Sequence, residues 1–537
     1  MDFLGRRKIK LLLLGVILSG AALRIYHIGF SLPYVTHPDE GRYLPTAISM
    51  LSRLDFNPKY FENPPFLSYI YAFATCLYFI IWKISSLFLK LPNFKELWEN
   101  DPTTFYIMAR TINVIFGVGT CLVAYRIAKK IFNETIGIIS CALLSFCYLH
   151  LRDSHYAVND VPSVFFMVLA FKYIVDVWAG GGTKSYVLAG IMSGIAVATK
   201  YNVGIIVVPF LTAYLLKQHY KEAEGRRRFF IFFIFCLIGF YIGCPWIILD
   251  AKMFFKGFLS TLSYSKQPWL GCSAESSYIQ FLKTLLWGYG VVPCLFLAIG
   301  SAVLAMKKQV FLLLMIFPFT YYILLGASKL FFVRFAIPLI PFLCITSAYG
   351  IAHSSGYFSK FQKNRVIIFL TLIAILQGFI FSIRHDYLIG ETDTRVIART
   401  WVRKNIPSGS KILTEGYCPN LKDFVKDGSV KSYTFKEVWT DLPKKNIRDY
   451  IGEGYEFIVT SDFVRKRYTA DKERYPIESN FYSALDVDAE KVFSSDTCGK
   501  KIPFYFDEIY SPFWNLFILE RPGPCINIYK ITGLKIK

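Results

Sequence analysis

The sequence predicts a mainly α-helical, polytopic membrane protein that carries a small external α/β domain at its C-terminal end. The first observation is composition: 54% of the 537 residues are hydrophobic, 18% are charged, and the mean hydropathy is +0.40. A soluble protein cannot solvate that much apolar surface. The second observation is a series of apolar segments of the length that crosses a bilayer. The third is a C-terminal stretch in which helical and strand-like patterns alternate.

Eleven apolar segments are predicted to be spanning helices. A span needs about 20 mostly apolar residues, and fewer when partner helices cover its ends. The segments are residues 9–28, 105–126, 135–151, 161–178, 186–199, 202–216, 229–249, 284–305, 309–327, 335–353 and 366–383.

The positive charge indicates the orientation of these spans. The chain has 60 Lys and Arg against 38 Asp and Glu, a net charge of +22. The basic clusters, such as 6–10, 126–130 and 226–228, fall on alternate loops, and loops rich in Lys and Arg face the cytoplasm. We therefore expect the N-terminus inside, as an uncleaved anchor rather than a signal peptide, and residues 384–537 outside. Charge spread in this way predicts no nucleic-acid partner.

Residues 66–91 test that topology. The segment is apolar enough to span, but one more crossing there would place every later basic cluster outside. We expect it to lie in the outer interface or to fold as a re-entrant hairpin. One true span with a miscounted neighbour is the alternative. The transmembrane domain is thus predicted over 1–383, with interfacial helices in a first outer loop at about 36–104.

The external domain is predicted over 384–537. Residues 394–405 have a helical pattern, and 411–414, 457–460 and 526–531 have strand patterns. Of the twelve cysteines, eight lie in apolar segments as small packing residues. One disulfide among Cys418, Cys498 and Cys525 is compatible with an oxidising compartment, but the sequence does not fix the pairing.

The first outer loop carries the adjacent carboxylates Asp39 and Glu40, followed by Arg42. Carboxylates at the edge of a bilayer are costly unless they are used. The alternative is structural: Thr36 to Asp39 has the form of a capping box, so Asp39 would only start an interfacial helix. A helix N-terminus is also a good place to hold a carboxylate or a phosphate, so the two interpretations are compatible.

Further charged residues are predicted on the same outer side. The second outer loop contains His155 and Asp160, although Asn159 or Asp160 could simply cap the next span and His155 could be a hydrogen-bonded interfacial residue. Lys200 and Arg334 depart from the positive-inside pattern, and the alternatives there are snorkelling and interface anchoring. Carboxylates and isolated cations together suit a substrate with a lipid-linked phosphate.

An ordered set of motifs resembles a known family. They are His-Pro-Asp39-Glu40-x-Arg42-Tyr43, Asn63-Pro64-Pro65, Ala109-Arg110, Ser154-His-Tyr-Ala-x-x-Asp160, Ala198-Thr-Lys200-Tyr, Arg334-Phe-Ala-Ile-Pro-Leu-Ile-Pro341, Arg399-Thr-Trp401 and Arg521-Pro-Gly-Pro524. The chain resembles the polytopic glycosyltransferases of the C superfamily, above all the bacterial protein O-mannosyltransferase-like group with the lipid A aminoarabinose transferases. Members often have a basic residue where this chain has Asn63, which weakens a phosphate contact there.

The resemblance implies an inverting glycosyltransferase. A sugar would move from a polyprenyl-phosphate donor to an acceptor hydroxyl at the outer face of a bacterial inner membrane. Asp39 would be the catalytic base, and Glu40, Arg42, His155, Asp160, Lys200 and Arg334 would bind substrate. The acceptor, a protein, lipid A or another glycan of the cell envelope, stays open. No cofactor is implied with certainty, and a divalent metal near Asp160 stays open. The external domain would be periplasmic and would cover the site, select the acceptor or only stabilise the fold.

Three other classes compete with this hypothesis. A secondary transporter would place charges or broken helices near the membrane midplane, often in inverted repeats, which the sequence does not show. A lipid-linked glycan polymerase or ligase would use the same donor class but transfer whole glycans. A scaffold or receptor with an external domain would need no reactive carboxylate.

Overall fold

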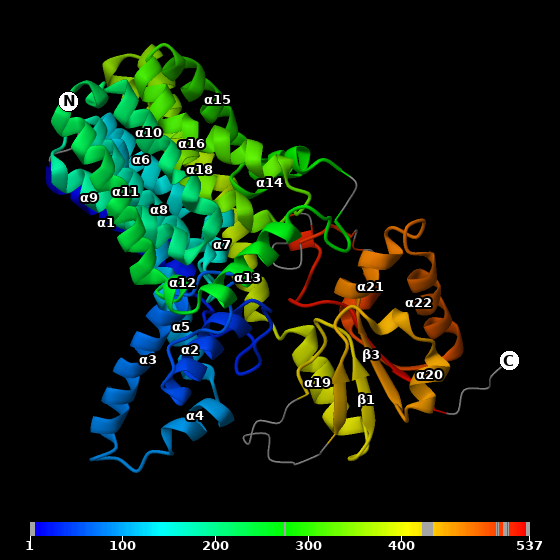
Figure 1. The fold of residues 1–537 in the computed structure, drawn as a ribbon. Helices are drawn as coiled ribbons and strands as arrows, with labels where there is room; N and C mark the ends of the chain where they lie inside the picture. The colour runs from blue at the N-terminus through cyan, green and yellow to red at the C-terminus, as the bar shows by residue number, and fades with distance from the viewer. Residues whose placement is uncertain are drawn as a thin grey trace.

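The computed structural model describes residues 6–532 except 273–274, 422–432, 501, 503, 508–512 and 514. A helical bundle holds the N-terminal end of the described chain, and a domain built on a sheet lies to one side of it (Figure 1). The helices α2, α3 and α4 extend from the end of the bundle that lies nearest the sheet domain (Figure 1). The residues predicted to face outward therefore share one end of the molecule.

The helices cover the whole predicted transmembrane region. They are α1 (Arg6–Ile25), α2 (Glu40–Arg53), α3 (Phe66–Ser85), α4 (Phe94–Asn100), α5 (Thr103–Ile131), α6 (Glu134–Ser145), α7 (Tyr148–Asp153), α8 (Asp160–Trp178), α9 (Thr183–Thr199), α10 (Val207–Leu216), α11 (Ala223–Gly243), α12 (Trp246–Leu249), α13 (Ala251–Tyr264), α14 (Ser277–Gly288), α15 (Val291–Ala305), α16 (Lys308–Ala327), α17 (Ile340–Ser354) and α18 (Lys360–Gly390). Two 3₁₀ segments, η1 (Tyr201–Ile206) and η3 (Val333–Leu339), lead into α10 and α17.

The chain is a multi-pass membrane protein. Among the described residues, six helices are long and apolar enough to cross a bilayer, and up to seven if α14 and α15, which meet at a bend of 110°, form one broken span. Each of the eleven predicted segments coincides with helical structure, but several are shorter or more charged than a full span. The count of eleven and the inside position of the N-terminus stay predictions.

The segment 66–91 is not a hairpin. Phe66–Ser85 is one continuous helix, α3, so the re-entrant form of the prediction is wrong. By length and hydropathy α3 is itself among the six candidate spans. Its position in the outer interface stays a prediction.

Close packing fixes the end of α9. A Cβ atom on Gly194 would lie 2.1 Å from the carbonyl oxygen of Cys236, and one on Gly239 would lie 2.3 Å from that of Ile191. Only glycine permits this approach of α9 to α11, as in other membrane helix pairs. The last turn of α9, which leads directly to Lys200, is therefore held by backbone contact.

The C-terminal region forms a five-stranded mixed sheet with helices against it (Figure 1). The strands are β1 (Lys411–Thr414), β2 (Thr434–Glu437), β3 (Phe457–Ser461), β4 (Glu490–Ser494) and β5 (Ile526–Lys530), in the order β2-β1-β3-β5-β4. β1 is parallel to β2 and β3, whereas β5 is antiparallel to β3 and β4. The accompanying helices are α19 (Thr394–Asn405), α20 (Ile447–Gly452), α21 (Asp462–Thr469) and α22 (Pro476–Asp488). The predicted helix and three strands are confirmed.

One disulfide joins Cys498 to Cys525. It links the segment after β4 to the residue before β5, and Cys418 is a free thiol. The sequence had left this pairing open.

Candidate active site

Asp39 lies at the start of α2, but it does not cap that helix. It is the residue before Glu40, and its side chain makes no capping hydrogen bond. The predicted helix is thus confirmed and its interfacial position stays a prediction, while the capping-box explanation of Asp39 is wrong. The carboxylate contacts Arg334 instead, with Oδ2 3.2 Å from Nη2.

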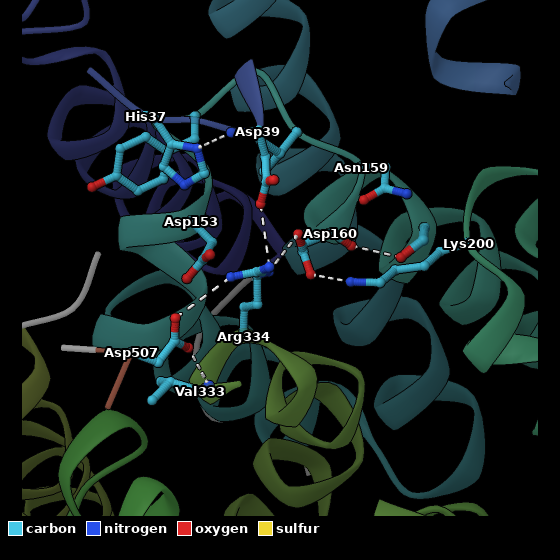
Figure 2. Close-up of polar contacts among 12 residues, drawn as sticks. His37, Asp39, Asp153, Asn159, Asp160, Lys200, Val333, Arg334 and Asp507 are labelled. Atoms are coloured by element: carbon cyan, nitrogen blue, oxygen red, sulfur yellow. Dashed lines mark hydrogen bonds and ion pairs between the residues drawn. The ribbon is translucent and has the colours of Figure 1, made fainter. Parts of the chain in front are cut away.

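Arg334 is the centre of the site. It lies on η3 and contacts three carboxylates from distant parts of the chain: Asp39, Asp160 at 3.9 Å and Asp507 at 3.6 Å. Figure 2 shows the guanidinium between these groups, with Asp507 also accepting a hydrogen bond from the backbone N–H of Val333. The contacts join the first outer loop, the start of α8 and the C-terminal region. These contacts argue against the alternative that Arg334 only anchors the chain at the membrane interface.

Lys200 and Asp160 form the other half of the centre. The Lys200 ammonium pairs with Asp160, and only 12% of the lysine side chain is exposed, so it does not snorkel to solvent. Asp160 is the first residue of α8, where the helix dipole favours a negative charge. Asn159 makes no capping bond either, and its amide Nδ2 donates to the Thr199 carbonyl at 2.8 Å. The capping alternatives therefore fail.

Arg42 lies at the edge of the centre. Its Nε is 4.0 Å from Asp39 Oδ1, its Nη1 donates to the hydroxyl of Tyr60, and about half of its side chain is exposed. It lines a cavity of about 400 Å³ together with Tyr60 and Arg53. A cation with this exposure can meet a ligand that enters beside Asp39.

Two predicted binding residues are placed differently. Glu40 is fully buried, and both carboxylate oxygens accept hydrogen bonds from Arg110 at 2.8 Å. One of them also accepts the Ala157 N–H at 2.8 Å. His155 is fully buried against Asp386 of α18. The contacts favour a positioning role for Glu40, and they do not bring His155 to the Arg334 centre.

Neighbouring charges set the protonation of the centre. Partial burial by itself would raise the pKa of Asp39, but Arg334, with smaller contributions from His37, Arg42 and Lys200, holds it below the ordinary value. Burial raises the pKa of Asp507 to about 6 despite the opposing charge of Arg334. Asp39 is therefore an ionised acceptor at neutral pH, whereas Asp507 titrates just below it.

Sequence reasoning missed Asp507 and the role of Arg110. Asp507 lies in a C-terminal segment with no local motif, and only the fold brings it to Arg334. Arg110 had appeared in the family resemblance, but without a partner. Asp153 also lies close to the centre (Figure 2). Its carboxylate accepts hydrogen bonds from its neighbour Arg152.

The centre does not fit a divalent ion at Asp160. One oxygen of that carboxylate pairs with Lys200, and the other faces Arg334. Lysine and arginine side chains supply the positive charge that a metal would bring. The chemistry of the centre is that of an ionised base next to fixed cations.

A cavity lies between the first outer loop and the sheet domain. Its volume is about 300 Å³, and Tyr34, Thr36 and Pro38 of the loop face Tyr417 and Trp439 of the domain across it. Pro38 immediately precedes Asp39, so this space adjoins the centre.

Solved structures of other proteins are similar to this fold. The apo oligosaccharyltransferase of Archaeoglobus fulgidus has 13% identity and a TM-score of 0.58 over 89% of this chain and 73% of that one. ArnT of Cupriavidus metallidurans has 14% identity and a TM-score of 0.53 over 86% of this chain and 94% of that one. Its complex with undecaprenyl phosphate gives 13% identity and a TM-score of 0.52, with the same coverage. At these identities the likeness establishes the fold.

The sequence itself adds the family. Residues 106–248 match the family described as dolichyl-phosphate-mannose-protein mannosyltransferase. Part of the chain thus matches a mannosyltransferase family, and the fold of the chain is similar to those of an oligosaccharyltransferase and of ArnT. No curated protein sequence matches it. The matched region includes Arg110, Asp160 and Lys200, so a glycosyltransferase family covers part of the centre around Arg334.

Proposed function

We propose that this protein is a glycosyltransferase of the C superfamily, which transfers one sugar from a polyprenyl-phosphate donor to an acceptor hydroxyl at the outer face of the membrane, with inversion at the anomeric carbon. The family match supports the donor class, since its description names a lipid-phosphate-linked sugar. The similarity to ArnT bound to undecaprenyl phosphate adds the same chemistry on the same fold. The membrane is proposed to be the bacterial inner membrane, with residues 384–537 on the periplasmic side.

The observation that carries the proposal is the contact between Asp39 and Arg334. A displacement of this kind needs a base for the incoming hydroxyl and positive charge on the departing phosphate. Here an ionised carboxylate and a guanidinium lie 3.2 Å apart at the outer end of the bundle. Lys200 is joined to the same guanidinium through Asp160.

Each residue then has a defined role. The acceptor oxygen attacks the anomeric carbon and forms the new C–O bond, while its proton passes to Asp39. The bond from that carbon to the phosphate oxygen breaks, and the phosphate leaves with the electron pair. Arg334 binds the phosphate through two N–H groups, and Lys200 and Arg42 add charge.

Donor binding also activates the base. Arg334 is foremost among the cations that hold the pKa of Asp39 down against the effect of burial. When the guanidinium shares its charge with a phosphate, that depression weakens and the pKa of Asp39 rises. The carboxylate thus becomes a stronger base only when a donor is present.

The acceptor is proposed to enter through the cavity between the first outer loop and the sheet domain. That cavity ends at Pro38, next to the base, and its aromatic residues Tyr417 and Trp439 offer flat apolar faces. A protein hydroxyl is the acceptor that the family description favours. Lipid A or another envelope glycan is the alternative, which the resemblance of the sequence motifs to the aminoarabinose transferases implies.

A transfer assay with defined donors tests the proposal. Full-length protein in detergent or nanodiscs is incubated with polyprenyl-phosphate sugars and with a hydroxyl peptide, lipid A or a glycan, and the products are weighed by mass spectrometry. The expected product is the acceptor plus one sugar, formed only with a lipid-phosphate donor. Transfer of a whole glycan would establish a ligase or polymerase. Donor transport across a vesicle membrane without any product would establish a transporter.

A further inference from the structure

A second cluster of reactive side chains lies away from Arg334, between the loop after α7 and helix α18. It consists of His155 from the loop and His385 and Asp386 from α18. At most 2% of each side chain is exposed to solvent in the two histidines, and 3% in Asp386. Their ligand atoms, one nitrogen from each imidazole and one carboxylate oxygen, all lie within 4.8 Å of one another.

The facing atoms of this cluster lack hydrogen bonds. Within the described part of the chain, neither oxygen of Asp386 accepts a hydrogen bond, and His155 Nε2 and His385 Nδ1 have no hydrogen-bond partner. A buried carboxylate without hydrogen bonds or a counter-charge is strongly unfavourable. The nearby Arg24 is committed elsewhere, since its N–H groups donate to Ser154 and to the backbone carbonyls of Gly20 and Ser145.

The protonation of His155 adds a second constraint. Its Nδ1 lies 3.3 Å from the Leu151 carbonyl, which can only accept, so Nδ1 carries the proton. In the neutral ring Nε2 then carries a lone pair, which faces the Asp386 carboxylate. Two electron-rich atoms buried face to face are stabilised by a proton or a metal ion held between them.

The spacing of the cluster selects the kind of cation. His155 Nε2 is 3.4 Å and His385 Nδ1 is 3.5 Å from the same oxygen of Asp386. Zinc binds imidazole and carboxylate at about 2.0–2.2 Å, so tetrahedral ligands lie about 3.3–3.5 Å apart. Octahedral ligands at similar bond lengths would lie closer, at about 3.0 Å. The ligand atoms of the two imidazoles lie within 4.8 Å of each other.

We propose that His155, His385 and Asp386 bind a zinc ion. The fourth position is open to water, because the cluster supplies three ligands among the described residues. His385 also lines a cavity of about 100 Å³ that separates α18 from the sheet domain, and this gives the ion a path. The ion ties the loop that leads to Asp160 to the helix that leads to the external domain.

The experiment measures the metal directly. Full-length protein is purified through a tag that involves no metal, stripped with a chelator, reloaded with zinc and desalted, and its zinc content is determined by mass spectrometry. We expect about one zinc ion per chain, and loss of that ion in His155→Ala and in Asp386→Asn. His353→Ala is the matched control, because His353 belongs to the far end of α17, and it should keep the ion. A reloaded wild type without zinc, or variants that retain it in full, would overturn the proposal.

A variant that keeps a zinc ligand distinguishes loss of the metal site from failure to fold. His385→Cys should still bind zinc, because thiolate is a good zinc ligand. Loaded with cobalt(II), the wild type should show the intense visible absorption of a tetrahedral site. His385→Cys should add a thiolate-to-cobalt charge-transfer band that the wild type lacks. If His385→Cys binds cobalt without that band, His385 is not a ligand and the proposal is wrong.

Discussion

Two arginine–carboxylate centres lie side by side in this protein, because Glu40 and Asp39 are consecutive residues. Arg110 holds Glu40 through two hydrogen bonds of 2.8 Å, and neither side chain has exposed surface. Arg334 contacts Asp39 and two further carboxylates over 3.2–3.9 Å, and the Asp39 side chain keeps 28% of its exposure. We call the buried Arg110–Glu40 pair the closed centre, and the partly exposed cluster of Arg334 with its carboxylates the open centre.

The difference indicates what each centre does. A buried, two-pronged pair fixes geometry, and it has no room for a ligand. The Arg110 guanidinium also binds the carbonyls of Ile28 and Phe30, so the closed centre fixes the chain on both sides of the first outer loop. The open centre can exchange one of its carboxylate contacts for a phosphate. The closed centre therefore fixes the loop, and the open centre is the one that we propose performs the chemistry.

The largest effect is expected for Asp39→Asn. The amide keeps the shape of the side chain but cannot accept the hydroxyl proton, so kcat should fall about 10²–10⁴-fold. The thermal unfolding midpoint should stay near that of the wild type, because the side chain is partly exposed and does not cap α2. Initial rates of sugar transfer, beside a melting curve, check both statements. Turnover at the wild-type rate would remove Asp39 as the base.

Glu40→Ala should have the opposite profile. It leaves the Arg110 charge buried without a carboxylate, which costs about 3–5 kcal/mol of folding free energy. The measurement is the free energy of unfolding in detergent. The double variant Glu40→Leu with Arg110→Met removes both charges and should recover part of that loss. A double variant less stable than Glu40→Ala would show that the pair is not an isolated closed unit.

The sequence predicts the local features of both centres. The sequence identifies the first outer loop, and the helix after Asp39, from their local chemistry. It identifies Lys200 and Arg334 because these cations depart from the positive-inside pattern. The strand at 411–414 and the helix at 394–405 are equally local, and the structure confirms both. Local residue chemistry and hydrophobic periodicity can be interpreted for each segment of the sequence separately.

Contacts between side chains that lie far apart in the sequence cannot be predicted from the local sequence. Nothing near Asp507 indicates that it meets Arg334, more than 170 residues earlier in the chain, because the contact depends on how the sheet domain packs on the bundle. The same holds for Glu40 and Arg110, and for the burial of His155 against α18. Residue type suggested a substrate role for Glu40 and His155, and only their partners argue for another.

Arg334→Lys should weaken donor binding without changing the fold. The lysine keeps the charge but loses the planar fork that binds two phosphate oxygens. A hydrogen bond to a charged group contributes about 1.5–3 kcal/mol, so the KM for the donor should rise about 10- to 100-fold. Arg42→Lys serves as the comparison, since Arg42 lies 4.0 Å from Asp39 at the edge of the centre and should have a smaller effect. Equal effects of the two variants would place the phosphate between the two arginines.

The smallest effect concerns pH and Asp507. Burial raises the pKa of this carboxyl to about 6, so it is ionised at pH 7 and becomes neutral as the pH falls below 6. Protonation removes one negative charge 3.6 Å from Arg334, and the guanidinium then attracts a phosphate more strongly. An ion pair of this kind contributes about 1 kcal/mol, so the KM for the donor should fall about fivefold from pH 7 to pH 5. Asp507→Asn should have the low KM at both pH values, because its amide has no charge to lose. A wild type and variant with parallel pH profiles would show that Asp507 does not compete with the donor for Arg334.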